Sequence, residues 1–108
     1  MQLNEYSEKA AKTAIYGTDY EIVYPALGLA SEAGEFAGKV KKVLRDQGGI
    51  FQQVDKESLM LELGDVLWYV AALARDIGFS LEVVAQHNLD KLQSRAERNV
   101  IKGSGDNR

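Results

Sequence analysis

Hydrophobic residues recur along this chain at spacings of three and four, which is the period of an α-helix and not of a strand. The pattern predicts four helices and no strand, over about residues 3–16, 24–45, 55–77 and 81–100. Glycines follow the second and third of these stretches, where glycine commonly ends a helix. We therefore expect an all-α protein with the architecture of a four-helix bundle.

The apolar stripes of the predicted helices differ in character. The second and third helices carry a narrow stripe that is typical of bundle packing. The stripe of the fourth helix begins with Leu81 and Val84 and then turns polar at Asn88 and Arg95. A stripe of this kind marks either a fraying helix end or a binding site.

Composition narrows the class of protein. The chain has 108 residues, which suits a single domain over 1–108, with a tail over 101–108 that is either flexible or able to cover a substrate. A net charge of -3 argues against binding to a nucleic-acid backbone. Without a signal peptide, a membrane span or any cysteine, the sequence predicts a cytoplasmic protein with no membrane association.

Two pairs of carboxylates stand out in the second and third helices. Glu32 and Glu35 are three residues apart, as are Glu62 and Asp65, so each pair shares one helix face. Each acidic residue also directly precedes a residue of the apolar stripe. If the two helices pack antiparallel, both pairs flank one groove.

Four carboxylates in one groove repel each other unless a cation is present. Oxygen ligands of this kind suit Mg²⁺, Mn²⁺ or Ca²⁺. Gly34 and Gly64 fall inside the two acidic pairs, and a glycine in mid-helix costs about 1 kcal/mol relative to alanine. This shared cost suggests that something approaches the backbone there. Acidic pairs on helices are also common on solvated surfaces, and spacing alone does not separate the two interpretations.

Basic residues near these carboxylates would suit a polyphosphate, because a metal ion and cations share the phosphate charge. Lys39 and Lys42 follow Glu35 on its helix, where they either contact phosphates or form ion pairs such as Glu35 with Lys39. Asn88, Lys91 and Arg95 occupy the polar part of the fourth helix, and we interpret them as substrate contacts.

Two further residues are candidates for substrate binding. Trp68 lies three residues beyond Asp65, where it either stacks on a nucleobase or belongs to the core. Lys102, in the tail, is placed to close over phosphates. His87 is the only histidine, which excludes a site built from several histidines, and we interpret it as structural.

The segments Glu32-Ala33-Gly34-Glu35 and Glu62-Leu63-Gly64-Asp65 resemble the acidic signature of the MazG-like nucleotide pyrophosphohydrolases. The resemblance extends over 29–35, 62–69, 88–92, Arg95 and 101–106. One departure is Ser31, where many members of the family carry a further glutamate.

The resemblance implies an all-α dimer or dimer of dimers that hydrolyses nucleoside triphosphates to monophosphate and pyrophosphate, as in nucleotide house-cleaning. It implies Mg²⁺, with Mn²⁺ as a substitute, held by Glu32, Glu35, Glu62 and Asp65. Glu32 or Glu35 would accept the proton of the attacking water. A phosphoribosyl-ATP pyrophosphohydrolase, an all-α dUTPase and a non-catalytic, cation-binding helical module are the alternatives.

Overall fold

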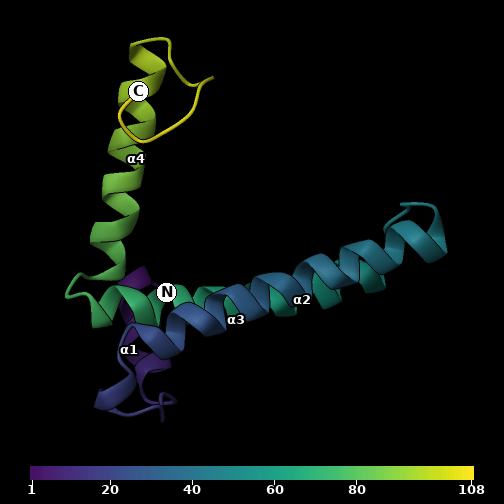
Figure 1. The fold of residues 1–108 in the computed structure, drawn as a ribbon, viewed down its shortest axis with the longest axis horizontal. Coiled ribbons are helices and arrows are strands. Elements are labelled where there is room, and N and C mark those ends of the chain that lie inside the picture. Colours follow the sequence, from purple (N-terminus) through teal and green to yellow (C-terminus); the bar gives the residue numbers. More distant parts are fainter.

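The computed structural model describes residues 1–108, and it is entirely helical. Figure 1 shows the arrangement of its elements. They are α1 (Leu3–Ala11), the 3-10 turn η1 (Thr18–Tyr20), α2 (Val23–Gln47), α3 (Gln53–Asp76) and α4 (Leu81–Glu97). The prediction of an all-α chain is confirmed. None of these helices is long and apolar enough to cross a membrane.

Helices α2 and α3 form a long antiparallel hairpin, in which they lie side by side (Figure 1). Gly48 ends α2 in the left-handed conformation, with φ of 63°, and the Gly49 N–H donates to the Val43 carbonyl at 3.2 Å. The Asp55 carboxylate accepts from the Gln52 N–H at 2.9 Å and caps the start of α3. The hairpin therefore sets the middle of α2 opposite the middle of α3.

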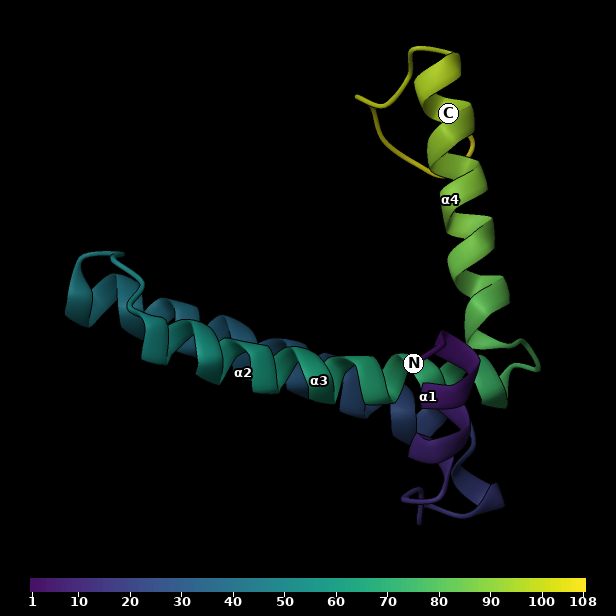
Figure 2. The same cartoon turned by 180° about the vertical axis from the view of Figure 1, so that it is seen from behind.

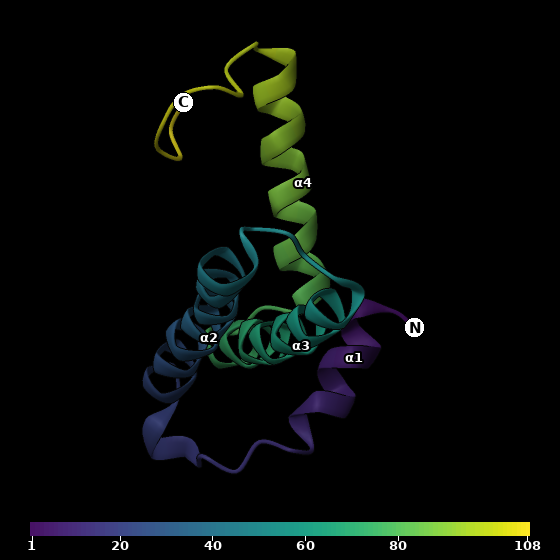
Figure 3. The ribbon, with the colours of Figure 1, turned by 90° about the vertical axis from the view of Figure 1, so that its right-hand side faces the viewer.

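The remaining helices pack against one end of this hairpin. Figure 3 shows α3 lying between α2 and α1, while α4 leaves the hairpin at the end of α3. The buried residues where α1, α3 and α4 meet are mostly small: Ala10, Ala71, Ala72 and Ala74, with Leu81. Small side chains let the helix backbones approach closely. Ser80 caps α4, since its hydroxyl oxygen accepts from the Val83 N–H at 3.1 Å.

A single chain does not close the expected four-helix bundle. Figures 1 and 2 show α4 projecting away from the hairpin. The radius of gyration is 16.7 Å, against about 13 Å for a compact domain of this length. Leu63, which belongs to the predicted apolar stripe of α3, is 55% exposed. The chain therefore leaves apolar faces open that a closed bundle would bury.

The first helix ends earlier than predicted, at Ala11 instead of residue 16. The Thr13 hydroxyl donates to the Ala10 carbonyl at 2.7 Å and satisfies a group that would otherwise continue the helix. Residues 12–22 then run as an irregular connection, the α1–α2 segment, interrupted only by η1. This segment borders the candidate site.

Candidate metal centre and adjoining pocket

Three of the four predicted ligands converge on one point of the hairpin. Glu32 and Glu35 come from successive turns of α2, and Glu62 faces them from α3. One carboxylate oxygen of each lies within 4.8 Å of the other two. Glu62 is only 8% exposed, so the cluster reaches from the surface of the hairpin into the contact between its helices.

The surroundings of Glu62 fit a divalent cation. Its Oε1 accepts from the Lys39 ammonium at 2.7 Å, and Lys39 also donates to the Ser58 hydroxyl at 2.8 Å. Its Oε2 is buried and has no hydrogen-bond partner. A buried carboxylate oxygen without a partner is unfavourable, and a hard cation shared with Glu32 and Glu35 would satisfy it. The donor set therefore fits the predicted Mg²⁺.

The surroundings of the cluster shift the pKa of Glu32. Burial raises the pKa of Glu32, and the nearby charges of Glu35, Asp65 and Glu62 raise it further. Asp65 lies outside the close group of three, but it lines the same cavity as Glu32. The fourth predicted ligand is thus a neighbour of the cluster and not part of its closest contacts.

A cavity of about 340 Å³ adjoins the carboxylates. Glu32 and Asp65 lie on its wall, and the other lining residues are Thr13, Ile15, Tyr16, Tyr24, Trp68 and Tyr69. The Trp68 indole N–H donates to the Thr13 hydroxyl at 2.8 Å. An aromatic pocket beside a metal site suits a planar ring attached to a phosphate chain.

One pocket wall depends on a glycine. A Cβ at Gly28 would lie only 2.2 Å from the ring of Tyr69, so no other residue fits there without moving that ring. Gly34 and Gly64 differ, because a Cβ at either position would meet no atom of the chain within 4 Å. The predicted close approach at these two glycines is therefore not made within one chain.

Sequence reasoning missed the contribution of the α1–α2 segment. Tyr16 and Tyr24 stack with ring centroids 5.1 Å apart and complete the aromatic lining. Asp76, the last residue of α3, was also missed, although the sequence gives a reason to notice it. An acidic side chain is disfavoured at the negative, carboxyl-terminal end of a helix dipole. A residue placed against that preference needs a compensating contact.

The predicted basic residues divide into two groups. Lys39 pairs with Glu62 across the hairpin and does not pair with Glu35, and Lys42 lines a small cavity with Lys39 but has no contact with the carboxylates. Asn88, Lys91 and Arg95 lie on α4, away from the hairpin, and Lys102 lies in the tail. One chain does not bring these four residues to the cluster.

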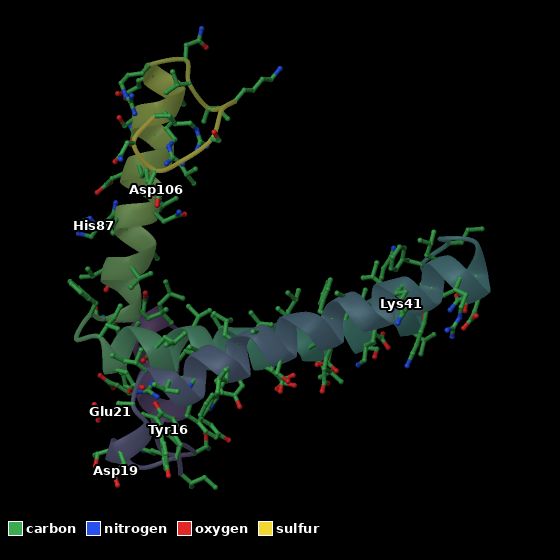
Figure 4. The ribbon with its side chains drawn as sticks, in the orientation of Figure 1. Tyr16, Asp19, Glu21, Lys41, His87 and Asp106 are labelled. Carbon is green, nitrogen blue, oxygen red and sulfur yellow. The ribbon has the colours of Figure 1, made fainter.

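The cations of α4 are held by the tail instead. Figure 4 shows Asp106 beside α4, where its Oδ1 accepts from Lys91 at 3.0 Å and from Arg95 at 3.1 Å. Arg95 is only 5% exposed, and its Nε is buried without a partner. These hydrogen bonds lower the pKa of Asp106. Two adjacent cations on one helix form a site that suits an anion.

The carboxylate cluster, the neighbouring aromatic pocket and the separate cation pair are groups that an all-α nucleotide-binding protein would need. A family model described as the MazG nucleotide pyrophosphohydrolase domain matches residues 25–100. The chain belongs to this family, as the acidic motifs indicated. Members of the family act on nucleotides.

One curated relative is similar over its whole length. The Gene 37 protein of Mycobacterium phage L5 is 49% identical over 114 residues, with 100% of both chains covered. No solved structure matches the chain.

Proposed function

We propose that this protein is a Mg²⁺-dependent hydrolase that splits nucleoside triphosphates into monophosphate and pyrophosphate. The observation that carries the proposal is the cluster of Glu32, Glu35 and Glu62, whose oxygens lie within 4.8 Å of one another, with the orphaned Oε2 of Glu62 beside it. These three carboxylates would hold Mg²⁺, which would supply charge stabilisation for the attack of water at the α-phosphorus.

The carboxylates differ in their proposed roles. Glu62, buried and paired with Lys39, which Ser58 holds in turn, is the anchor that would hold the ion in place. Asp65 adds negative charge at the edge of the site, next to Glu32. Glu32 is the proposed acceptor for the proton of the attacking water, because it belongs to the cluster and also lies on the wall of the pocket. Glu35, on the same face, is the alternative acceptor.

The pocket is proposed to receive the nucleobase. Trp68 and Tyr69 line it, with rings 4.9 Å apart in an edge-on arrangement, and Glu32 and Asp65 lie on its wall. A base held there would place its phosphates towards the carboxylates. Phosphoryl transfer needs little beyond positioning and charge stabilisation, so this small site is sufficient.

The working unit is proposed to be a homodimer or a dimer of dimers. On both helices of the hairpin, an exposed apolar residue directly follows a residue that is buried or half-buried between the helices. Because the two helices run antiparallel, these exposed residues lie on the same side of the pair. They are Ala33, Ala37 and Leu44 of α2 and Leu63 and Leu67 of α3. A second hairpin covering this apolar face would complete the four-helix bundle that one chain leaves open.

The same arrangement accounts for the cations of α4. At a rise of about 1.5 Å per residue, roughly 16 Å of α3 separates Asp65 from the end of that helix, and Lys91 lies a further ~15 Å along α4. Lys91 and Arg95 therefore lie too far from the carboxylates of their own chain to bind the same triphosphate. We propose that Asn88, Lys91, Arg95 and Lys102 contact the phosphates in the site of a partner subunit.

The test is pyrophosphate release from a panel of nucleoside triphosphates, dUTP and phosphoribosyl-ATP, with Mg²⁺ or with EDTA. We expect Mg²⁺-dependent release, which Glu62→Ala lowers by about 100-fold or more because it removes the anchoring ligand. Mn²⁺ is expected to support the reaction in place of Mg²⁺. Glu57→Ala is the matched control, since Glu57 is an exposed carboxylate of the same helix without a contact.

Each other outcome points elsewhere. Full activity of Glu62→Ala would contradict the site. Turnover of phosphoribosyl-ATP or dUTP alone would narrow the substrate to that of a related enzyme. A rise in melting temperature with Mg²⁺ but no hydrolysis of any nucleotide would identify a cation-binding helical module.

A further inference from the structure

The α1–α2 segment forms one complete wall of the aromatic pocket, although it is irregular. Thr13, Ile15 and Tyr16 come from this segment, and Tyr24 comes from the first turn of α2. The opposite wall is carried by α3, with Trp68 and Tyr69. An irregular wall keeps its shape only if specific contacts hold it, because no helical hydrogen bonds do so.

The Trp68 indole holds the start of the segment through Thr13, and one carboxylate, that of Asp76, holds the rest. Both oxygens of Asp76 accept from the Tyr16 hydroxyl, at 3.0 and 2.9 Å, and one of them also accepts from the Ile22 N–H at 2.9 Å. Tyr16 lies near the middle of the segment and Ile22 at its end, so Asp76 ties two points of the second half of the segment to the last turn of α3. These hydrogen bonds compensate for an acidic residue at the unfavourable end of the helix dipole.

The backbone at Ile22 depends on this support. Ile22 has φ of 67° and ψ of -52°, and the Val23 N–H donates to the Glu21 carbonyl at 2.7 Å across it. This is a γ-turn with positive φ, which is rare and strained, and strain is greatest for a β-branched residue. Such a conformation persists only where neighbouring contacts enforce it. The hydrogen bond from Ile22 to Asp76 is the contact that does so here.

The consequence of the turn is the position of the aromatic rings. Tyr16 stacks on Tyr24 at 5.1 Å and 15°, and Tyr24 in turn lies 6.5 Å from Tyr69. Burial and the hydrogen bond to Asp76 both raise the pKa of Tyr16, in agreement with a hydroxyl that donates to a carboxylate. Tyr16 lies at one end of this series of rings, and Asp76 is the only hydrogen-bond partner of its hydroxyl.

We propose that Asp76 is a positioning residue that sets the aromatic wall of the pocket and thereby the affinity for the base of the nucleotide, without acting on the metal or the phosphates. This inference rests on the proposed function, because it assigns the base to this pocket. Asp76 touches neither the carboxylate cluster nor the cavity itself. Its effect is transmitted through Tyr16 and through the turn at Ile22.

The test compares Asp76→Ala with Asp19→Asn. Asp19 lies in the same segment but makes no hydrogen bond through its side chain; Figure 4 shows where Tyr16, Asp19 and Glu21 lie. We expect the KM for nucleoside triphosphates to rise about 10-fold in Asp76→Ala with kcat changed less than about 2-fold, the signature of lost ground-state binding. Asp19→Asn should match the wild type.

A base-free probe separates positioning from general damage. Inorganic tripolyphosphate binds through metal and phosphate contacts only, so its inhibition constant should stay the same in Asp76→Ala. Tyr16→Phe, which removes the hydroxyl and keeps the ring, should raise KM less than Asp76→Ala. The double variant should be no worse than Asp76→Ala, because both residues act through one contact.

Several outcomes would overturn the proposal: an unchanged KM in Asp76→Ala with intact helical circular dichroism, equal weakening of tripolyphosphate, or additive effects in the double variant. If Asp76→Ala does not fold, Asp76→Asn and Tyr16→Phe carry the same comparison. If the wild type hydrolyses no nucleotide, the proposed function fails separately. Quenching of Trp68, the only tryptophan, by added nucleotide then measures whether Asp76 controls binding in the pocket.

Discussion

Glu62 combines two properties that conflict in the metal-free protein. It is buried, which makes a charge unfavourable, and it lies in a cluster of like charges, which adds repulsion. Lys39 relieves both effects by pairing with Oε1 at 2.7 Å, but it leaves Oε2 without a partner. Lys39 therefore compensates the charge at Oε1 only, and Oε2 is the oxygen that is proposed to bind the metal.

Because Lys39 and the proposed Mg²⁺ both compensate the charge of Glu62, the loss of Lys39 should matter less when Mg²⁺ is bound. In EDTA, Lys39→Met should lower the free energy of unfolding by about 1–2 kcal/mol, because it leaves a buried carboxylate without its cation. With saturating Mg²⁺ the difference from wild type should shrink, since the ion supplies the missing charge. Thermal unfolding of both proteins with and without Mg²⁺ measures the effect.

The matched control is Lys41→Met, which removes an exposed lysine from the same helix; Figure 4 labels this residue. Lys41 makes no ion pair, so its loss should change stability equally little in both conditions. If the Lys39→Met defect were the same with and without Mg²⁺, then the ion would not bind at Glu62.

At the scale of elements, the tail is held to α4 through Asp106 and is folded on itself through Arg108. Asp106 accepts from Lys91 and Arg95, and Arg108 donates to the carbonyls of Val100, Ile101 and Gly105. Gly103 and Gly105, both with positive φ, allow the chain to reverse between these contacts. The tail therefore forms a closed loop whose acidic residue occupies the cation pair.

The lowered pKa of Asp106 fixes the direction of its pH dependence. A carboxyl with a folded-state pKa below its ordinary 3.8 stabilises the docked tail above that value, and the contribution is lost as the pH falls through the lowered pKa. An NMR titration of the Asp106 carboxyl should therefore have its midpoint below 3.8. In Asp106→Asn at pH 7, amides of residues 99–106 should exchange a few-fold faster, whereas Asp90→Asn should leave them unchanged.

The elements with strong apolar periodicity were predictable, and the irregular ones were not. The bounds of α2 and α3 follow from their stripes and from Gly48, which ends α2 in a left-handed conformation that glycine adopts more readily than other residues. The path of the α1–α2 segment could not be predicted, because it depends on hydrogen bonds to Asp76, a residue distant in the sequence. The partner of Lys39 was missed for the same reason, since only the hairpin brings Glu62 beside it.

The candidate site divides along the same line. Convergence of Glu32, Glu35 and Glu62 could be predicted, because i,i+3 spacing and antiparallel packing are local rules. The aromatic wall contributed by Tyr16 and Tyr24 could not, since Tyr16 lies in a connecting segment without a periodic signal and Tyr24 takes its place in the wall by stacking on Tyr16. The expected gathering of the α4 cations at the carboxylates does not occur within one chain.

At the scale of the whole molecule, the open shape and the divided site have one explanation. A radius of gyration of 16.7 Å, an exposed apolar face on the hairpin and cations held far from the carboxylates are all costs for an isolated chain. Pairing two copies would bury the face and, in the same step, bring the cations of one chain to the carboxylates of the other. Burial of the apolar face and completion of the site would then both depend on dimerisation.

Mixing two inactive variants tests this directly. Glu62→Ala lacks the metal anchor and Lys91→Ala lacks a phosphate contact, so each alone should lose activity. In a symmetric dimer with sites shared between chains, half of a randomised equimolar mixture is heterodimer, and each heterodimer holds one complete site. Activity should therefore return to about a quarter of the wild-type value. If each chain used its own Lys91, every site in the mixture would still lack one residue, and mixing would restore nothing.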